Sequence, residues 1–339
     1  MRYWDCLPKG RVRGSMRVNT RVVIDIASDR VIERDSFNYS GPVDQCGRAL
    51  EVVAGFATNP GASFTALTAS TGQSFTVRGT DITKGTWLLS SWAFNATAGE
   101  LRIRSPRLHD FFSGIRNRVT AALTAPLFID PTGDSYAQRL YAQDNLTVEL
   151  TGGGAEIDTA SLLIAYEDLG GVAGRFIDNP TLAKIGLNVV TVEVTVVAVA
   201  TGNFGGAVAV NSSIDNLIAN TDYAILGGLT DTRGDSCGIT GVDFGNLRVG
   251  FPLEPSLRSL TSNWFVKLSD SFNSPYIPVF NSANKTQTTI DVQTTGTGGT
   301  YIINLELVQL LPGQVPGGAT GAAVQAGGGG APTSAGQPH

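Results

Sequence analysis

Residues 145–154 read NLTVELTGGG, and residues 288–299 read TTIDVQTTGTGG. Both stretches begin as an alternating strand and end in a turn of Gly and Thr, and Val148 of the first falls on Ile290 of the second. Apolar residues at every second position are typical of a strand with one buried face. If other segments match at a similar offset, the chain contains one β-domain twice.

Three further pairs of segments match in the same order along the chain. They are GTWLLSS (85–91) with TDYAILGG (221–228), LTAPLFI (123–129) with LTSNWFV (260–266), and the alternation of Leu162, Ile164 and Tyr166 with that of Ile303, Leu305 and Leu307. The offset between matched residues changes little from one pair to the next. Self-similarity of this kind predicts a duplication. We place the first copy at 45–175 and the second at 185–312.

Short strands separated by Gly, Asn, Asp, Ser and Pro dominate both copies, which is typical of a β-sandwich or barrel. The fold class predicted is therefore all-β, with two tandem β-sandwich or barrel domains, one or two short helices and extended terminal arms. The expected strands are SFTALTA (63–69), QSFTVRG (73–79), TWLLSSWAF (86–94), ELRIRS (100–105), NLTVEL (145–150), SLLIAYE (161–167), NVVTVEVTVVAVA (188–200), DYAILGGLT (222–230), NWFVKL (263–268), TTIDVQT (288–294) and YIINLELVQLL (301–311).

Two segments have the features of helices. Ser105 and Pro106 supply an N-cap and a first-turn proline, and apolar residues then recur at helical spacing as far as Leu123. This pattern predicts a helix near 106–120. A second, shorter helix is predicted at NPTLAKIG (179–186).

Charge is distributed unevenly along a chain of 339 residues whose net charge is −5. Residues 1–44 begin with a basic arm, in which one acidic residue accompanies Arg2, Lys9, Arg11, Arg13, Arg17 and Arg21. Such an arm can contact the phosphates of nucleic acid or of lipid, and the alternative is a solvated terminus. Residues 313–339 form a tail of Gly, Ala and Pro that lacks the large apolar side chains needed to fold alone.

A second basic cluster lies in the middle of the first copy. It consists of Arg102, Arg104, Arg107, Arg116 and Arg118, with Asp110 as the acidic residue among them. Arginine is favoured in subunit contacts because its planar guanidinium binds carboxylates in two places. The cluster is therefore a candidate for a subunit contact or a phosphate contact, and an ordinary solvated face is the alternative.

The sequence offers little to catalysis or metal binding. Cys6, Cys46 and Cys237 are far apart, and His109 and His339 are the two histidines. We therefore expect no zinc site, no disulfide framework and no cofactor. The beginning of the chain is polar and basic, so no signal peptide is expected. The apolar run LNVVTVEVTVVAVA (187–200) is shorter than the roughly 20 residues of a membrane-spanning helix and has the composition of a strand.

The stretch RGDSCG (233–238) admits three interpretations. It contains a tripeptide that some cell-surface receptors bind, and it resembles the nucleophile segment of chymotrypsin-like proteases, for which His109 would be the base. We favour a third interpretation, a turn lengthened relative to NATAGE (95–100) of the first copy. Both copies would then resume with LRIRSP (101–106) and LRVGFP (247–252). The residues of this inter-barrel distinguishing loop are Arg233, Gly234, Asp235, Ser236 and Cys237.

Two tandem β-domains, a basic arm and a flexible tail resemble the double jelly-roll major capsid proteins of tailless, often membrane-containing phages and related viruses. The resemblance covers about 45–312 and rests on the repeat. It implies a homotrimer with a pseudo-hexagonal footprint that tiles an icosahedral shell. It also implies penton or spike proteins as partners, and an inner face where the arm meets a membrane or the genome. The virion, assembled in the host cytoplasm, is the implied location.

Two other classes of protein also fit a β-rich chain. A phage spike or tail-associated adhesin that binds a host glycan or receptor would show the same β-domains. A secreted β-sandwich enzyme is disfavoured, because the chain has two histidines and no expected secretion signal.

Overall fold

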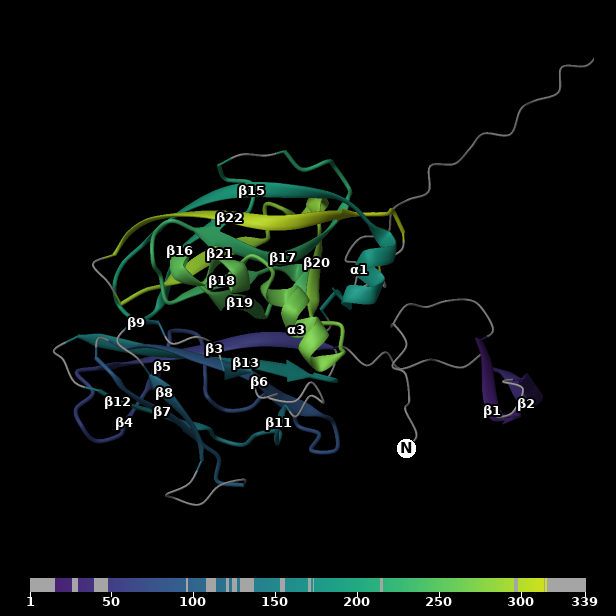
Figure 1. The fold of residues 1–339 in the computed structure, drawn as a ribbon, viewed down its shortest axis with the longest axis horizontal. Helices are drawn as coiled ribbons and strands as arrows, with labels where there is room; N and C mark the ends of the chain where they lie inside the picture. The colour runs from purple at the N-terminus through teal and green to yellow at the C-terminus, as the bar shows by residue number, and fades with distance from the viewer. Residues whose placement is uncertain are drawn as a thin grey trace, which may run out of the picture.

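The fold was analysed in a computed structural model (Figure 1). The structure describes residues 16–25, 30–39 and 48–315, except 96, 108–113, 120–121, 124–126, 129–136, 153–155, 170–171, 173, 214–215, 296–297 and 314.

Two antiparallel sheets form the first half of the body, which we call the first barrel. Its strands are β3 (Ala49–Thr58), β4 (Thr65–Ala66), β5 (Thr68–Ala69), β6 (Thr86–Asn95), β7 (Gly99–Arg104), β8 (Ile115–Val119), β9 (Ala122–Leu123), β10 (Leu127–Phe128), β11 (Gln138–Leu140), β12 (Thr147–Thr151) and β13 (Ile157–Tyr166). One sheet has the order β10-β6-β13-β3-β5, with β9 and β11 also on β6, and the other has the order β4-β12-β7-β8.

Two more sheets form the second barrel. Its elements are β14 (Phe176–Ile177), α1 (Asn179–Ile185), β15 (Gly186–Ala198), β16 (Phe204–Ala209), β17 (Asp222–Thr230), β18 (Ser236–Thr240), β19 (Arg248–Pro252), α2 (Arg258–Thr261), α3 (Trp264–Phe272), β20 (Ile277–Asn281), β21 (Thr289–Gln293) and β22 (Gly299–Leu310), with short 3-10 turns at 242–244, 255–257 and 282–284. The sheet orders are β14-β20-β17-β22-β15 and β16-β21-β18-β19.

The two barrels share one strand order. Each barrel has eight successive strand positions along the chain. The first, eighth, third and sixth positions lie side by side in one sheet, and the second, seventh, fourth and fifth lie side by side in the other. In the first barrel β9, β10 and β11 together occupy the sixth position, beside β6. Two sheets of four strands joined in this way make a jelly roll. The chain is a double jelly roll, and the predicted all-β fold class is confirmed.

The four sheets lie in layers (Figure 1). From one side to the other these are the β15–β22 sheet, the β18–β21 sheet, the β3–β13 sheet and the β7–β12 sheet. The second and third layers face each other, so the β3–β13 sheet is covered on both sides. Leu162 and Ile164 of β13 belong to the core of the first barrel, whereas their neighbours Leu163 and Ala165 belong to a cluster that continues into the second barrel.

The structure brings most of the matched segments to equivalent strands. Val148 and Ile290 lie on β12 and β21, and Leu162 and Ile303 lie on β13 and β22. The pair Leu162↔Val53 in the first barrel corresponds to Ile303↔Val194 in the second, because both members of the pair shift along the chain by the same offset. The strands β12 and β13 were therefore aligned correctly with β21 and β22. Trp87 and Tyr223 lie on equivalent strands but out of register, because Ser91 pairs with Leu162 whereas Thr230 pairs with Ile303.

Three predicted elements are wrong, and in two of them helix and strand are exchanged. Residues 115–119, expected to be helical, form β8 and pair with β7, because Arg116 and Arg118 alternate with more buried neighbours as a strand requires. Leu108, His109, Phe111 and Phe112 of that expected helix lie outside the described residues. Conversely, NWFVKL, expected as a strand, lies in α3, where burial recurs at helical spacing from Trp264 to Phe272. The described residues of LTAPLFI, which are Leu123, Leu127 and Phe128, lie on strands, whereas LTSNWFV spans parts of α2 and α3. This match therefore joins unlike structures.

The short helix predicted at 179–186 is confirmed as α1, with Asp178 as N-cap accepting from the Thr181 backbone N–H at 2.8 Å. QSFTVRG is not a regular strand and contributes one isolated bridge, Thr76↔Asn145.

Part of the predicted basic arm is a hairpin. Strands β1 (Met16–Asp25) and β2 (Arg30–Tyr39) pair antiparallel, with Arg17 opposite Asn38 and Arg21 opposite Asp35. The remaining basic residues of the arm, Arg2, Lys9, Arg11 and Arg13, and the tail beyond residue 315 lie outside the described residues.

Candidate functional site

The contact between the two barrels is the most elaborate polar site of the described chain. Trp92 of β6 is 1% exposed and donates through Nε1 to Ser236 Oγ of β18 at 2.9 Å. Ser161 of β13 lies 2.8 Å from the same Ser236 oxygen. The ring of Trp92 meets Trp264 of α3 edge-on, with centroids 5.6 Å apart. One indole therefore contacts both a strand and a helix of the second barrel.

A second line of hydrogen bonds crosses the contact beside the first. Gln293 of β21 accepts from Ser161 Oγ at 3.2 Å and donates to the carbonyl of Gly202 at 2.8 Å. That carbonyl also accepts from Ser70 Oγ at 3.2 Å. Because buried polar groups are costly unless paired, these bonds fix the position of one barrel on the other.

Asp235 lies at the edge of this contact and is 3% exposed. Its carboxylate accepts from Thr159 Oγ1 at 2.9 Å, across the contact, and from Thr295 Oγ1 at 3.4 Å. Burial raises the pKa of Asp235 to about 7, since the hydrogen bonds and the charge of Arg233 only partly oppose it and Asp158 adds to it.

The RGDSCG stretch is therefore mostly buried. Arg233 stacks over the Phe94 ring at 4.3 Å, and Ser236 and Cys237 are both fully buried. Burial raises the pKa of the Cys237 thiol well above its ordinary value. An exposed receptor tripeptide and an accessible nucleophile are both inconsistent with this burial. Arg233, Gly234 and Asp235 lie in the connection between β17 and β18. Ser236 and Cys237, predicted to belong to the same turn, instead begin β18, where Ser236 joins the two barrels of one chain.

The alignment proposed for this region is also wrong. LRIRSP falls on β7 and LRVGFP on β19, which are the fourth and fifth strand positions of their barrels. The strand equivalent to β7 is β18, because Ile103 pairs with Val148 as Ile239 pairs with Ile290. Between the third and fourth strands, five residues (231–235) of the second barrel replace three (96–98) of the first.

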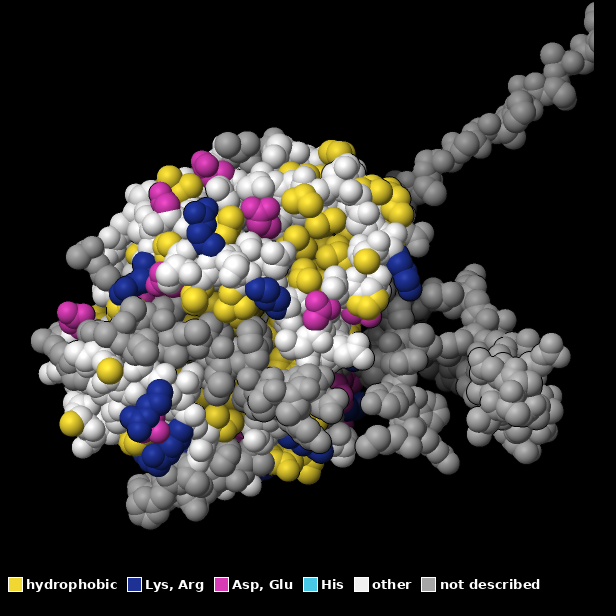
Figure 2. Space-filling model, in the orientation of Figure 1, with side chains coloured by type: hydrophobic (Ala, Val, Ile, Leu, Met, Phe, Trp, Pro, Cys, Tyr) yellow, Lys and Arg dark blue, Asp and Glu magenta, His cyan; other side chains and the backbone are white. Residues whose placement is uncertain are grey.

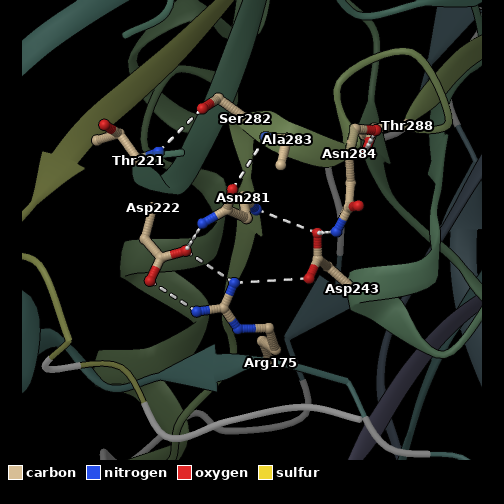
Figure 3. A network of polar contacts seen from close by, with 9 residues as sticks. All are labelled: Arg175, Thr221, Asp222, Asp243, Asn281, Ser282, Ala283, Asn284 and Thr288. Carbon is tan, nitrogen blue, oxygen red and sulfur yellow. Dashed lines mark hydrogen bonds and ion pairs between the residues drawn. The ribbon is translucent and has the colours of Figure 1, made fainter. Parts of the chain in front are cut away.

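A second site anchors the segment that links the barrels (Figure 3). Arg175, which is 9% exposed, donates to both carboxylate oxygens of Asp222 at 2.8 and 2.7 Å and lies 3.5 Å from Asp243. Asn281 donates from its side chain to Asp222 and from its backbone to Asp243, and Asn284 also donates to Asp243. Burial opposes the charge of Arg175, but the two carboxylates outweigh it and raise its pKa.

The predicted arginine cluster lies on the outer surface of the first barrel. Figure 2 shows dark-blue side chains around an acidic one over the corner where β7 and β8 lie. Arg102 and Arg104 both bind Glu149, at 2.7 and 2.8 Å, and Arg116 lies 3.5 Å from Glu100. Arg118 is exposed on β8, and Arg107 is exposed in the turn after β7.

Glu149 and Phe64 hold this cluster together. Burial opposes ionisation of Glu149, but the hydrogen bonds from Arg104 and Arg102 keep its pKa below the ordinary value. Arg102 also stacks on Phe64, with the guanidinium carbon 3.7 Å from the ring centroid. The sequence placed these arginines in one cluster but gave no signal for Glu149 or Phe64 as their partners.

No motif in the sequence pointed to Trp92, Arg175, Asp222 or Asp243. Each is an isolated residue in its segment, and its role depends on a partner far away in the sequence, such as Asp222 for Arg175. Within the described part of the chain, no group of three His, Cys, Asp or Glu side chains is placed to hold a metal ion. The described helices are all too short or too polar to cross a membrane.

Comparison with known proteins adds solved structures but no sequence relatives. No protein family model matches the chain, and no curated protein sequence matches it. The major capsid protein P2 from bacteriophage PM2 covers 78% of this chain over 98% of its own length, at 7% identity and a TM-score of 0.21. A chain from the atomic structure of Sulfolobus turreted icosahedral virus covers 78% over 91% of its length, at 9% identity and a TM-score of 0.20. The fold assignment rests on the strand order.

Replacing Ser236 with Ala should lower the free energy of unfolding by about 1–2 kcal/mol, because the buried Trp92 N–H loses its acceptor. The loss should be smaller in a Trp92→Phe background, where no N–H remains and only the contact of Ser236 with Ser161 is removed. Urea unfolding of the four members of this double-mutant cycle measures it. Equal losses in both backgrounds would show that the bond contributes nothing.

Proposed function

We propose that the chain is a structural protein of a viral capsid, in which three copies form a ring of six barrels that tiles an icosahedral shell. The observation that carries this proposal is the contact inside the chain. In this contact the β3–β13 sheet of the first barrel packs on the β18–β21 sheet of the second barrel. These two sheets are not equivalent in the jelly roll, so the contact joins unlike faces.

A contact between unlike faces can be repeated. Such head-to-tail contacts generate closed rings when the rotation between neighbours divides the circle, and open filaments when it does not. Each chain uses the β3–β13 face and the β18–β21 face internally. The equivalent faces of the other barrel, on the β15–β22 and β7–β12 sheets, lie on the outermost layers (Figure 1). Three chains would then supply six barrels joined by six contacts of one geometry.

The remaining parts of the chain have roles in this proposal. The two jelly rolls correspond to 45–175 and 185–312, the basic arm to 1–44 and the tail to 313–339. We place the arm at the inner side of the shell, against an internal membrane or the genome, and penton or spike proteins at the vertices. The virion is the proposed location, after assembly in the host cytoplasm. In this proposal the side chains of the described polar sites hold the barrels, the linking segment and neighbouring chains together rather than serve catalysis.

The purified full chain should behave as a trimer in size-exclusion chromatography with light scattering. Electron microscopy of the same sample should show particles with a hexagonal outline, and concentrated samples should form sheets of them. A monomer that stays dispersed at high concentration would contradict the proposal. Isolated elongated spikes that bind a glycan would instead favour an adhesin.

A further inference from the structure

Two sheet faces of the chain lie on the outside of the stack. The first is the outer face of β7, β8 and β12, which carries the arginine cluster around Phe64 and Glu149; we call it the arginine face. The second is the outer face of β15 and β22, which we call the acidic face. Each belongs to an outermost layer in Figure 1.

The arginine face repeats a set of three side chains that is also found on the β18–β21 sheet of the second barrel, the sheet that contacts the first barrel. There, Arg248 stacks on Phe204 at 4.2 Å and binds Asp291 at 2.7 Å. Phe64, Arg102 and Glu149 make the same aromatic, guanidinium and carboxylate set in the first barrel. The two carboxylates correspond by strand pairing, since Glu149 lies opposite Arg102 and Asp291 lies opposite Gly238.

Gly238 explains how a different strand supplies the guanidinium. A Cβ at Gly238 would lie 2.5 Å from Arg248 Cδ and 2.3 Å from Asp291 Oδ1. The Arg248 side chain therefore occupies the space above Gly238 that the Arg102 side chain fills in the first barrel. The constellation is built twice, on equivalent sheets.

In the second barrel, the sheet with this constellation is where the first barrel docks. Gly250 lies beside Arg248 on β19, and a Cβ at Gly250 would lie 3.3 Å from Val52 of β3. Ser236 and Gln293 of the same sheet bind Trp92 and Ser161. The equivalent sheet of the first barrel presents its arginine face outward.

The acidic face corresponds to the face that docks inside the chain. The paired residues Val52 and Leu163 lie on β3 and β13, at the internal contact. The equivalent pair on β15 and β22 of the acidic face is Glu193 and Asn304. On β15, Val192, Val194 and Val196 point into the barrel, which leaves the alternate residues outward. The internal positions are apolar and buried, and the outer ones are more polar, as expected of a face exposed to water before assembly.

Exposed hydrophobic side chains accompany the acidic residues. Val189, Val197 and Ile302 are 68%, 63% and 40% exposed. The acidic face therefore combines apolar contact area with charge. Interfaces that form after folding commonly have this mixed character.

The charges of the two outer faces are complementary. Strands β7, β8, β12 and β4 carry four arginines and two glutamates, Glu100 and Glu149, a net charge of +2. Strands β15 and β22 carry Glu193 and Glu306 and no basic residue, a net charge of −2. Opposite charge steers encounter and selects the partner face.

We propose that the arginine face of one chain docks on the acidic face of a second copy, repeating between chains the contact made within each chain. This inference rests on the proposed function and names the two faces that join the three chains. Glu193 and Glu306 would lie against Arg116 and Arg118, the most accessible arginines of the other face.

Charge reversal on either face tests this pairing. Glu193→Arg with Glu306→Arg should reduce the trimer fraction at least tenfold at fixed concentration, and so should Arg116→Glu with Arg118→Glu. Joining all four substitutions in one chain restores complementarity and should recover the trimer. The matched control, Glu156→Arg with Asp231→Arg, makes the same charge change at exposed sites off both faces and should stay trimeric.

An equimolar mixture of the two double variants sharpens the test. One variant has two positive faces and the other two negative faces, so a ring of three cannot close without one like-charge contact. The mixture should therefore remain without trimers, although the fourfold variant assembles. Circular dichroism and thermal unfolding of each variant check that the barrels are folded.

The outcomes separate the two proposals. If the folded double variants stay trimeric, or if the fourfold variant fails to recover while the control assembles, the face pairing is wrong and the capsid proposal stands on other faces. If the unaltered chain forms neither trimers nor lattices, both proposals fail. Loss of trimers in both double variants with recovery in the fourfold variant supports the pairing.

Discussion

Replacing Arg175 with Met should lower the free energy of unfolding by about 3–5 kcal/mol, the range for removing one partner of a buried ion pair. Asp222 and Asp243 would be left side by side in the second barrel without their cation, while methionine fills a similar volume. Because Arg175 belongs to the segment that links the barrels, the loss should appear as one cooperative shift in urea or thermal unfolding.

Lys84→Met is the matched control for this prediction. Lys84 lies 3.5 Å from Asp168, but its side chain is 40% exposed, and exposed pairs contribute at most about 1 kcal/mol. A double variant, Arg175→Met with Asp222→Asn, should recover part of the loss because one buried charge is removed. If Arg175→Met unfolds at the same urea concentration as the unaltered chain, the polar network does not anchor the linking segment.

Asp235 should make the stability of the chain fall as the pH rises from about 4 to about 7. Its pKa is about 7 when folded and near 3.9 when unfolded, so the folded chain holds a proton that the unfolded chain releases. Stability from this group is complete below the unfolded pKa and is lost as the pH rises through the folded pKa. Three pH units correspond to at most about 4 kcal/mol.

Asp235→Asn tests this expectation, because an amide keeps one acceptor and one donor and cannot ionise. The variant should be more stable than the unaltered chain at pH 8 and should have a flatter stability profile between pH 4 and 7. Urea unfolding at several pH values measures both effects. Asp231→Asn, an exposed carboxylate of the same connection, controls for net charge. Parallel profiles of Asp235→Asn and the unaltered chain would exclude Asp235 as the source.

The sequence was most informative where a strand has one buried face. Alternation identified β12 through Val148 and Leu150, and β22 through Ile303 and Leu305, and it aligned these two strands correctly with their equivalents in the other barrel. It failed for β3, where Leu50 and Val52 join one cluster and Val53 the other. Apolar side chains on both faces of β3 hide its alternation, and the burial of its outer face comes from the second barrel.

The errors at β8, α3 and β18 have related physical causes. Short apolar runs fit either period, so Ile115 and Val119 matched a helix and Trp264 to Val266 matched a strand. In β18 the outward positions are Ser236 and Gly238, which contact the other barrel and Arg248, so the strand has the composition of a turn. The polar sites could not be predicted for the same reason: their partners are distant in the sequence.

The covalent connection through Arg175 changes the thermodynamics of any ring built from these barrels. Six separate barrels would lose translational and rotational freedom in five associations, whereas three linked pairs lose it in two. Each association avoided saves a free-energy cost of roughly 4–15 kcal/mol at the standard state. Within a linked pair, the effective concentration set by the tether takes the place of the concentration of free barrels. Within a linked pair the contact can therefore be permanent and apolar. Contacts between pairs are free to stay weak enough for misplaced subunits to dissociate and bind again.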